Sequence, residues 1–262
     1  MKKILFVFIS LLIVLMNGHS FAQDQENTEK RALAIIGDMY HAAAPLYNSI
    51  VVKLNNKGYK TDVIIDYNVP FENLSEYDII VLSRYGYDDI RQLREHVFQT
   101  REGRKYIWIT PDQEQAIEDW VKAGGHLFLH HDGIGYYPRD GAIVRLAKAF
   151  FISHPPIVPI MVKPTGKLPE LTSGVEHFVI SEEEYKLEIN ESATNVFLES
   201  FSEKNGRSVQ GWAHEYGKGK VAVFIPGHDR KVLEHPMVDL CIANIIKWLD
   251  KSLDDNLVKL YN

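Results

Sequence analysis

The organisation of this chain is indicated most directly by residues 212–229, which read Trp-Ala-His-Glu-Tyr-Gly-Lys-Gly-Lys-Val-Ala-Val-Phe-Ile-Pro-Gly-His-Asp. The pattern predicts two strands joined by a tight turn at residues 217–219, and the second strand ends at His228 and Asp229. An α/β domain binds ligands in the crevice beyond the carboxyl ends of its buried strands. His228 and Asp229 are therefore candidate site residues. The alternative is that Gly227 and His228 form only a polar surface turn.

Upstream of this stretch, apolar runs alternate with helical patterns. Nearly continuous apolar segments predict strands at 31–36, 60–67, 77–83 and 126–130. Helical patterns cover 46–54, 111–123, 141–151 and 235–249, and the second of these starts with the capping-box sequence Thr110-Pro111-Asp112-Gln113. Residues 152–211 have the pattern of strands and loops. Strands alternating with helices predict an α/β fold with a doubly wound, mostly parallel sheet in a single domain.

The two ends of the chain are expected to lie outside this domain. A basic start, an apolar stretch and the small residues before Gln23 predict a signal peptide over residues 1–22, with an uncleaved anchor as the alternative. Residues 23–30 are polar and predict a disordered lead-in, and 253–262 a C-terminal tail. No cysteine lies directly after the apolar stretch, where a lipid would be attached, so no lipid anchor is indicated. We expect a periplasmic or secreted protein, without membrane insertion after cleavage.

Composition and charge exclude several classes of partner. The chain has 262 residues, 45% of them hydrophobic, which is enough to bury a full core. Without residues 1–22 it carries 27 basic and 35 acidic side chains, a net charge of −8. This sign argues against nucleic acid and against an anionic membrane surface. Cys241 is the single cysteine and lies on an apolar helix stripe, so it predicts a core residue and no intrachain disulfide.

Polar residues that could carry chemistry follow three of the predicted strands. His41 follows the first, His130 with His131 and Asp132 the fourth, and His228 the last. A fourth candidate is the run Glu182–Tyr185. Neutral imidazoles and a carboxylate can hold a zinc-type ion, and the same groups without metal can act as general acid and base. Each histidine taken alone is more often a hydrogen-bonded structural residue. No HExxH spacing is present, so a metal site depends on the fold bringing these residues together.

Several motif-defined enzyme classes can be set aside. The chain has no GxSxG elbow, no P-loop and no GxGxxG that opens a helix, so no nucleotide cofactor is indicated. A residual amidotransferase or protease activity would need a reactive thiolate beside a histidine. Cys241 is expected to be buried, which argues against that activity.

With these residues identified, the chain resembles the ThuA-like (trehalose utilisation) family over about Arg31 to Leu249. The resemblance is carried by Tyr40-His41 and by residues 77–82, 120–130, 182–185 and 212–228. That family is similar to the class I glutamine amidotransferases without their catalytic cysteine. It therefore implies a three-layer, flavodoxin-like ThuA-like domain over 31–252. It also implies a role in sugar metabolism, on glycosides or their oxidised keto forms. The chain departs from the family pattern at Glu182, at Pro169-Glu170 and at His131, which bears on the substrate more than on the fold.

Our leading hypothesis is a carbohydrate-active enzyme that hydrolyses or isomerises a glycoside or keto-sugar. His130, Glu183, His228 and Asp229 are its candidate catalytic residues, with Asp229 orienting His228. His41, His130 and His228 are candidate ligands of one divalent ion such as zinc. The candidate substrate-binding residues are His41, His131, Asp132, Tyr185 and Trp212, although Trp212 is equally expected in the core.

The rival hypothesis is a non-catalytic sugar-binding or accessory protein on the same scaffold. In both cases the expected partner is a small carbohydrate. The sequence is compatible with a monomer and with a homo-oligomer. The two hypotheses differ in what should gather at the strand ends. An enzyme needs the histidines within about 5 Å of one another. A binder needs aromatic and amide side chains there instead.

Overall fold

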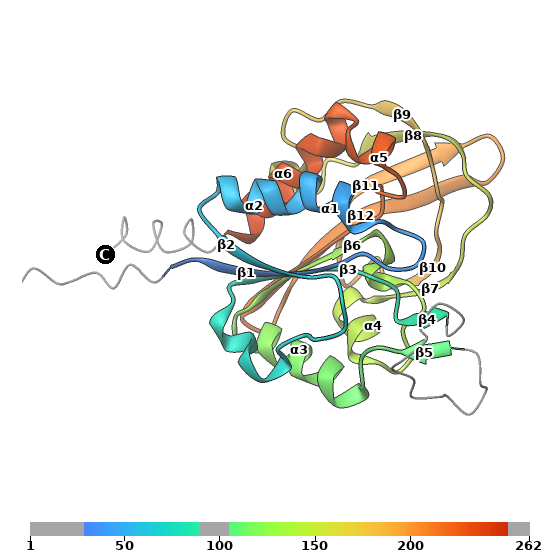
Figure 1. Cartoon of the computed structure of the whole chain (residues 1–262). Coiled ribbons are helices and arrows are strands. Elements are labelled where there is room, and N and C mark those ends of the chain that lie inside the picture. The colour runs from blue at the N-terminus through green and yellow to red at the C-terminus, as the bar shows by residue number, and fades with distance from the viewer. Residues whose placement is uncertain (1–28, 90–104, 251–262) are drawn as a thin grey trace, which may run out of the picture.

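A computed structural model describes residues 29–89 and 105–250, and it contains a nine-stranded mixed sheet with helices on both sides (Figure 1). The predicted signal peptide, most of the lead-in and the C-terminal tail lie outside the described residues. Within the described residues no helix combines the length and apolar character needed to cross a membrane.

One half of the sheet is parallel and consists of strands β2 (Lys60–Ile64), β1 (Arg31–Ile36), β3 (Ile79–Ser83), β6 (His126–His130) and β13 (Gly219–Phe224), in that order. Four of them match the predicted strands, and nearly every residue of β1, β3, β6 and β13 is buried. Because the strands are parallel, the segments after β1, β3, β6 and β13 meet at one edge of the sheet.

The other half of the sheet is antiparallel, which differs from the mostly parallel sheet expected from the sequence. Strand β13 pairs with β12 (Gly206–Tyr216), and the order continues through β11 (Asn195–Ser202), β8 (Val158–Pro164) and β9 (Phe178–Glu182). The hairpin turn predicted at residues 217–219 accounts for the β12–β13 pair, because Gly217 has a φ of +63°, which suits glycine. The other antiparallel strands, β11, β8 and β9, lie in residues 152–211, for which no strand order was predicted. Strand β9 ends at Glu182 and delivers the glutamate run to the same edge as the parallel strands.

Two short antiparallel pairs lie outside the main sheet. Strand β7 (Ala149–Ser153) pairs with β10 (Lys186–Ile189), and β4 (Tyr87–Asp89) pairs with β5 (Lys105–Ile107). Strand β10 of the first pair starts directly after the glutamate run, residues 182–185.

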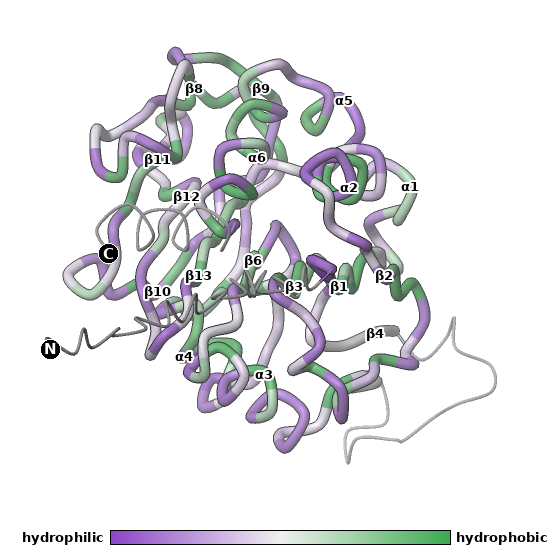
Figure 2. Tube along the Cα trace, turned by 90° about the vertical axis from the view of Figure 1, so that its left-hand side faces the viewer, coloured by the Kyte–Doolittle hydropathy of each residue, from purple (hydrophilic) through white to green (hydrophobic). Residues whose placement is uncertain are grey.

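The helices form two groups that bury separate apolar clusters against the two faces of the sheet (Figure 1). One group consists of α1 (Ala43–Leu46), η1 (Tyr47–Val51), α2 (Val52–Asn56), α5 (Arg230–Leu233) and α6 (Pro236–Leu249). The other contains α3 (Pro111–Ala123) and α4 (Ala142–Ala147), and the short helices η2 (Phe71–Glu76), η3 (His131–Ile134) and η4 (Pro169–Thr172) complete the set. Hydrophobic and hydrophilic residues alternate along α2 and α6 (Figure 2), as amphipathic helices require.

Two local predictions are confirmed in these helices. The Thr110 side chain accepts a hydrogen bond from the Gln113 N–H at 3.3 Å, and the Gln113 side chain accepts one from the Thr110 N–H at 2.9 Å. This is the reciprocal capping box that starts α3. Cys241 is fully buried on α6, and burial raises the pKa of its thiol to about 12. It is therefore a core residue and not a nucleophile.

Candidate functional site

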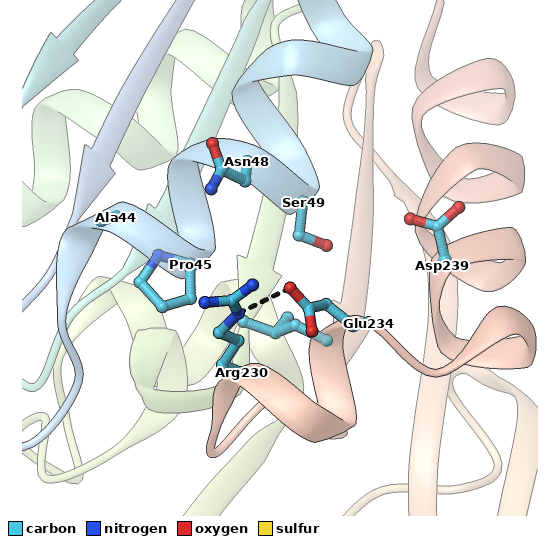
Figure 3. Close-up of a pocket in the computed structure, with 8 residues that line it drawn as sticks. Ala44, Pro45, Asn48, Ser49, Arg230, Glu234 and Asp239 are labelled. Atoms are coloured by element: carbon cyan, nitrogen blue, oxygen red, sulfur yellow. Dashed lines mark hydrogen bonds and ion pairs between the residues drawn. The ribbon is translucent and has the colours of Figure 1, made fainter.

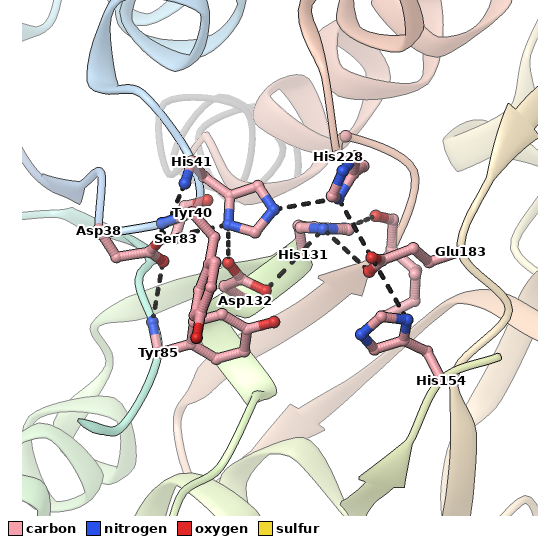
Figure 4. Close-up of polar contacts among 12 residues, drawn as sticks. Asp38, Tyr40, His41, Ser83, Tyr85, His131, Asp132, His154, Glu183 and His228 are labelled. Atoms are coloured by element: carbon pink, nitrogen blue, oxygen red, sulfur yellow. Dashed lines mark hydrogen bonds and ion pairs between the residues drawn. The ribbon is translucent and has the colours of Figure 1, made fainter. Parts of the chain in front are cut away.

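Three histidines from three different strand ends meet at the edge of the sheet (Figure 4). The ring of His41 lies 4.8 Å from that of His131 and 5.0 Å from that of His228, measured between centroids, and the other two rings are 5.7 Å apart. Glu183, from the loop after β9, reaches the same point. We call His41, His131, His228 and Glu183 the histidine–carboxylate cluster.

His131 occupies the place that the sequence suggested for His130. His130 is the last residue of β6 and is fully buried, with the Ser83 hydroxyl 3.0 Å from Nδ1 and the Pro226 carbonyl 3.2 Å from Nε2. Burial lowers its pKa to about 3. Both ring nitrogens of His130 therefore have structural hydrogen-bond partners, and neither faces the cluster. His131 has a φ of +46°, so its side chain leaves the strand path and enters the cluster.

The nitrogens of His131 have different roles. Nδ1 lies 2.6 Å from the carbonyl oxygen of Ile225, which accepts a hydrogen bond from it, so the proton of the ring is on Nδ1. Burial keeps the pKa of His131 well below its ordinary value, so the ring is neutral. Nε2 then carries a lone pair and faces Glu183 Oε2 at 3.5 Å. Both atoms are buried, and neither has a hydrogen-bond partner among the described residues.

Glu183 connects the remaining imidazoles. Its Oε1 lies 3.2 Å from His228 Nδ1 and 3.3 Å from His154 Nδ1. His228 Nδ1 is also 3.2 Å from His41 Nε2. The hydrogen bond to Glu183 raises the pKa of His228 above its ordinary value. His154, half-buried after β7, was missed because nothing in the 152–211 pattern separates it from an ordinary loop residue.

Two carboxylates contact Nδ1 of His41, on the side of the ring that faces away from the cluster. Asp132 pairs with its Nδ1, and Asp38 Oδ1 lies 3.2 Å from the same nitrogen. Burial alone would lower the pKa of His41, but the two carboxylates outweigh it and raise that pKa to about 10. Burial raises the pKa of Asp132 to about 7. Because Nδ1 is engaged on this side, Nε2 of His41 faces the cluster. Asp38 was not among the predicted site residues, although it lies three residues before His41 in the same segment after β1.

Glu182 fixes the two loops that supply Glu183 and His228. Its Oε2 accepts the backbone N–H groups of Gly227 at 2.7 Å and His228 at 3.1 Å, and its Oε1 accepts that of Glu183 at 2.7 Å. Gly227 has no room for a side chain, since a Cβ there would lie 2.3 Å from the ring of His130. The sequence did not reveal this role, because it depends on which loops meet.

Two predicted site residues, Asp229 and Tyr185, have structural roles that differ from those expected, and Trp212 lies in the core, which was its stated alternative. Asp229 caps α5, with Oδ1 accepting the Val232 N–H at 2.9 Å, and it is Glu183 that contacts His228. Trp212 is fully buried in the core and donates its indole N–H to Ala147 O at 2.7 Å. Tyr185 is also buried, and its hydroxyl donates to Asp132 at 3.2 Å. Neither of these aromatic rings offers a face to a substrate.

The spacing of the cluster suits a divalent ion. Tetrahedral zinc with ligands at 2.0–2.1 Å separates neighbouring ligand atoms by about 3.3–3.4 Å. The separations from His228 Nδ1 to His41 Nε2 and to Glu183 Oε1 are both 3.2 Å, and that from His131 Nε2 to Glu183 Oε2 is 3.5 Å. The three histidines form one set of potential ligands, and His131, His228, Glu182 and Glu183 form another, each within 4.8 Å. Nitrogen and carboxylate donors in this number suit zinc and similar ions.

A cavity of about 220 Å³ lies between the α1–η1 segment and helices α5 and α6 (Figure 3). It is lined by Ala44, Pro45, Asn48, Ser49, Arg230, Leu233, Glu234 and Asp239. Arg230 and Glu234, four residues apart along α5 and its C-cap, form an ion pair at 2.6 Å on one side of it. No residue of the histidine–carboxylate cluster lines this cavity, so we place the chemistry at the cluster.

Comparison with known proteins identifies relatives of both sequence and fold. The model of a family described as trehalose utilisation (ThuA) matches residues 13–249. No curated protein matches the chain.

Solved structures of low sequence identity share the fold. A ThuA-like protein from Bacteroides uniformis has a TM-score of 0.60 at 18% identity, covering 86% of this chain and 94% of that one. A ThuA-like protein from Parabacteroides merdae has a TM-score of 0.64 at 13% identity, covering 84% and 89%. A β-galactosidase from Rahnella sp. R3 has a TM-score of 0.54 at 13% identity, covering 84% of this chain and 31% of that one.

Proposed function

Because the chain belongs to the ThuA (trehalose utilisation) family, we propose that it is a metal-assisted enzyme that hydrolyses or isomerises a glycoside or keto-sugar. His41, His131, His228 and Glu183 would hold one divalent ion such as zinc. A periplasmic or secreted location, expected from residues 1–22, belongs to the same proposal.

The observation that carries the proposal is the pair of buried atoms His131 Nε2 and Glu183 Oε2. A lone pair on neutral imidazole faces a carboxylate oxygen at 3.5 Å, and residues 29–89 and 105–250 supply no hydrogen-bond donor to either atom. Two buried acceptors that face each other are costly unless a proton or a cation lies between them. Burial opposes protonation of His131, which favours the cation.

The groups around the cluster also suit a metal centre. Asp38 and Asp132 engage Nδ1 of His41, which is the carboxylate–histidine arrangement found behind many metal ligands. Glu182 fixes the backbone on both sides of the cluster. A bound divalent ion would polarise a sugar carbonyl or lower the pKa of a water molecule.

His154 is the best-placed group for proton transfer to or from a substrate. It is half-buried at the edge of the cluster, and its Nδ1 lies 3.3 Å from Glu183 Oε1. A proton can therefore pass between His154 and Glu183 without a large movement of either side chain. His154 is not in either histidine ligand set. We assign it the role of general acid or base, with Glu183 as its partner.

The composition of the cluster disfavours the non-catalytic alternative. A sugar-binding protein would place aromatic rings and amides at the point where the loops converge. Here that point holds imidazoles and carboxylates within 3.2–3.5 Å of one another.

The test is turnover of a sugar panel by residues 23–262 before and after chelation. Trehalose, methyl glucosides and their keto derivatives would be incubated with the protein, and products followed by NMR. We expect turnover that is lost with the chelator, returns with one divalent ion, and is absent in His131→Ala. The exposed His177→Ala is the matched control and should keep full activity. Binding of a sugar without turnover under every metal condition would contradict the enzyme and support the accessory protein.

A further inference from the structure

Tyr40 and Tyr85 lie beside His41 of the histidine–carboxylate cluster (Figure 4). The ring of Tyr85 is buried 5.9 Å from that of His41. The Tyr40 ring stands edge-on to Tyr85 at 5.4 Å, and the Tyr136 ring at 5.1 Å. Tyr40 is 60% exposed and Tyr136 is 40% exposed. The two exposed rings thus share one buried support beside a candidate metal ligand.

We infer that Tyr40 and Tyr136 form a carbohydrate-stacking subsite at the mouth of the cluster, which binds the apolar face of a sugar ring. The inference rests on the proposed function and names how that site would recognise its substrate. It also replaces Tyr185 and Trp212, whose rings are buried and cannot contact a ligand in this way.

The backbone supports this role for Tyr136. Its φ of +60° is uncommon for a bulky aromatic residue, and such conformations persist only where the surroundings enforce them. The enforcing contacts are present. Gly86 donates its N–H to Gly135 O at 2.9 Å, and Tyr137 donates its hydroxyl to Arg84 O at 2.9 Å. A Cβ at Gly86 would lie 2.7 Å from the Tyr136 carbonyl oxygen, so the two segments are in close contact.

Each exposed tyrosine is tied to the loop of a candidate metal ligand. Tyr40 precedes His41, and Asp38 Oδ1 accepts both of their backbone N–H groups at 2.9 Å. Tyr136 follows η3, the short helix that starts with His131. A sugar stacked on these rings would therefore lie beside the ligand atoms. Residues in strained backbone conformations gather at functional sites, which favours a ligand-binding role over a purely structural one.

A carbohydrate is the ligand class that this arrangement suits. Tyrosine combines an apolar ring face with a polar hydroxyl, and it can contact a molecule that presents C–H groups on one face and hydroxyls around its rim. Binding sites of this kind place a few polar groups next to aromatic surface. Here the polar groups are the exposed edges of His228 and His154.

The test is binding of trehalose and methyl glucosides to metal-loaded protein, measured by saturation-transfer NMR and calorimetry. The variants are Tyr40→Ala, Tyr136→Ala, their double variant and the two Tyr→Phe substitutions. We expect at least about tenfold weaker binding in the double variant, and near wild-type binding in the Phe variants. Metal content should be unchanged in all of them. Tyr47→Ala, which removes an exposed tyrosine from η1, is the control and should bind normally.

Tyr136→Gly separates ring loss from misfolding, because glycine tolerates the positive φ. It should weaken sugar binding as much as Tyr136→Ala while folding at least as well. Wild-type affinity in the double variant would overturn the subsite and leave the proposed function intact, and sugar contacts elsewhere, such as the cavity in Figure 3, would then be indicated. If the wild-type protein bound none of trehalose, the methyl glucosides and their keto derivatives, both the subsite and the proposed function would be overturned.

Discussion

Replacing Glu182 by glutamine should damage the metal site while all four proposed ligands, His41, His131, His228 and Glu183, stay in place. The carboxylate is fully buried and accepts three backbone N–H groups, two at Oε2 and one at Oε1. Glutamine has the same shape, but its NH₂ group must face at least one of those donors. The two loops that carry Glu183 and His228 would then lose a shared anchor.

The magnitude follows from the hydrogen bonds that are lost. A hydrogen bond to a charged group contributes about 1.5–3 kcal/mol, and removing the buried charge offsets part of that loss. We expect the free energy of unfolding to fall by about 2 kcal/mol, which lowers Tm by about 4–8 °C for a domain of this size. Loss of a group that orients metal ligands weakens metal binding by about 10- to 100-fold.

The neighbouring residue provides a matched control. Glu184 is buried, and its Oε2 accepts hydrogen bonds from Ser202 at 2.8 Å and from Asn205 at 2.5 Å. Glu184→Gln should therefore lower Tm by a similar amount and leave metal affinity unchanged. The assay is a titration of chelator-treated protein with zinc, combined with thermal unfolding without metal. Equal metal affinity in Glu182→Gln and wild type would refute the positioning role of Glu182, whatever the change in Tm.

Two further substitutions and a pH series distinguish side chains that stabilise the fold from side chains that bind the metal. His130→Gln should lower the free energy of unfolding by about 1–3 kcal/mol, because Ser83 and Pro226 lose their buried partner, yet the purified protein should keep its metal. Asp229→Ala should cost about 1 kcal/mol of stability through the lost cap of α5, visible in urea unfolding, with turnover unchanged. The pKa of His41 is raised from 6.5 to about 10, so protonation of His41 adds to the free energy of unfolding of the metal-free protein. This added stability is fully present below pH 6.5 and is lost as the pH rises toward 10. Unfolding measured at several pH values should show the decrease. A metal that displaces this proton should bind more tightly as pH rises over the same range, and an affinity that is flat between pH 7 and 9 would contradict His41 as a ligand.

Local sequence signals predicted the parts of the fold that depend on neighbours in the chain. The capping box at Thr110 and the apolar runs of β1, β3 and β6 need only nearby residues to be recognised. The β12–β13 hairpin was predicted, but the rest of the antiparallel half was missed because β8, β9 and β11 lie in residues 152–211, whose pattern does not specify their partners. Nothing in their composition specifies which strand each one joins.

The candidate site, like the fold, was predictable from the sequence only where local signals were sufficient. His41 and His228 were identified because each lies after a predicted strand, and parallel strands bring such positions together. Glu183 was named as part of the acidic run 182–185, with no strand predicted before it. His130 and His131 were exchanged because the left-handed conformation of His131 is not visible in the sequence. Trp212 was ambiguous because an aromatic residue in a strand suits both the core and a ligand. Glu182 and His154 act through contacts between loops, which no local pattern reveals.

Metal content of untagged residues 23–262 tests the central claim most directly. Elemental analysis of the purified protein should find about one zinc or similar divalent ion per chain. That ion should be lost in His131→Ala and His228→Ala and retained in His130→Gln. A protein that holds no ion even after incubation with divalent metals, or one that keeps its ion in His131→Ala, would contradict the metal site proposed for the histidine–carboxylate cluster.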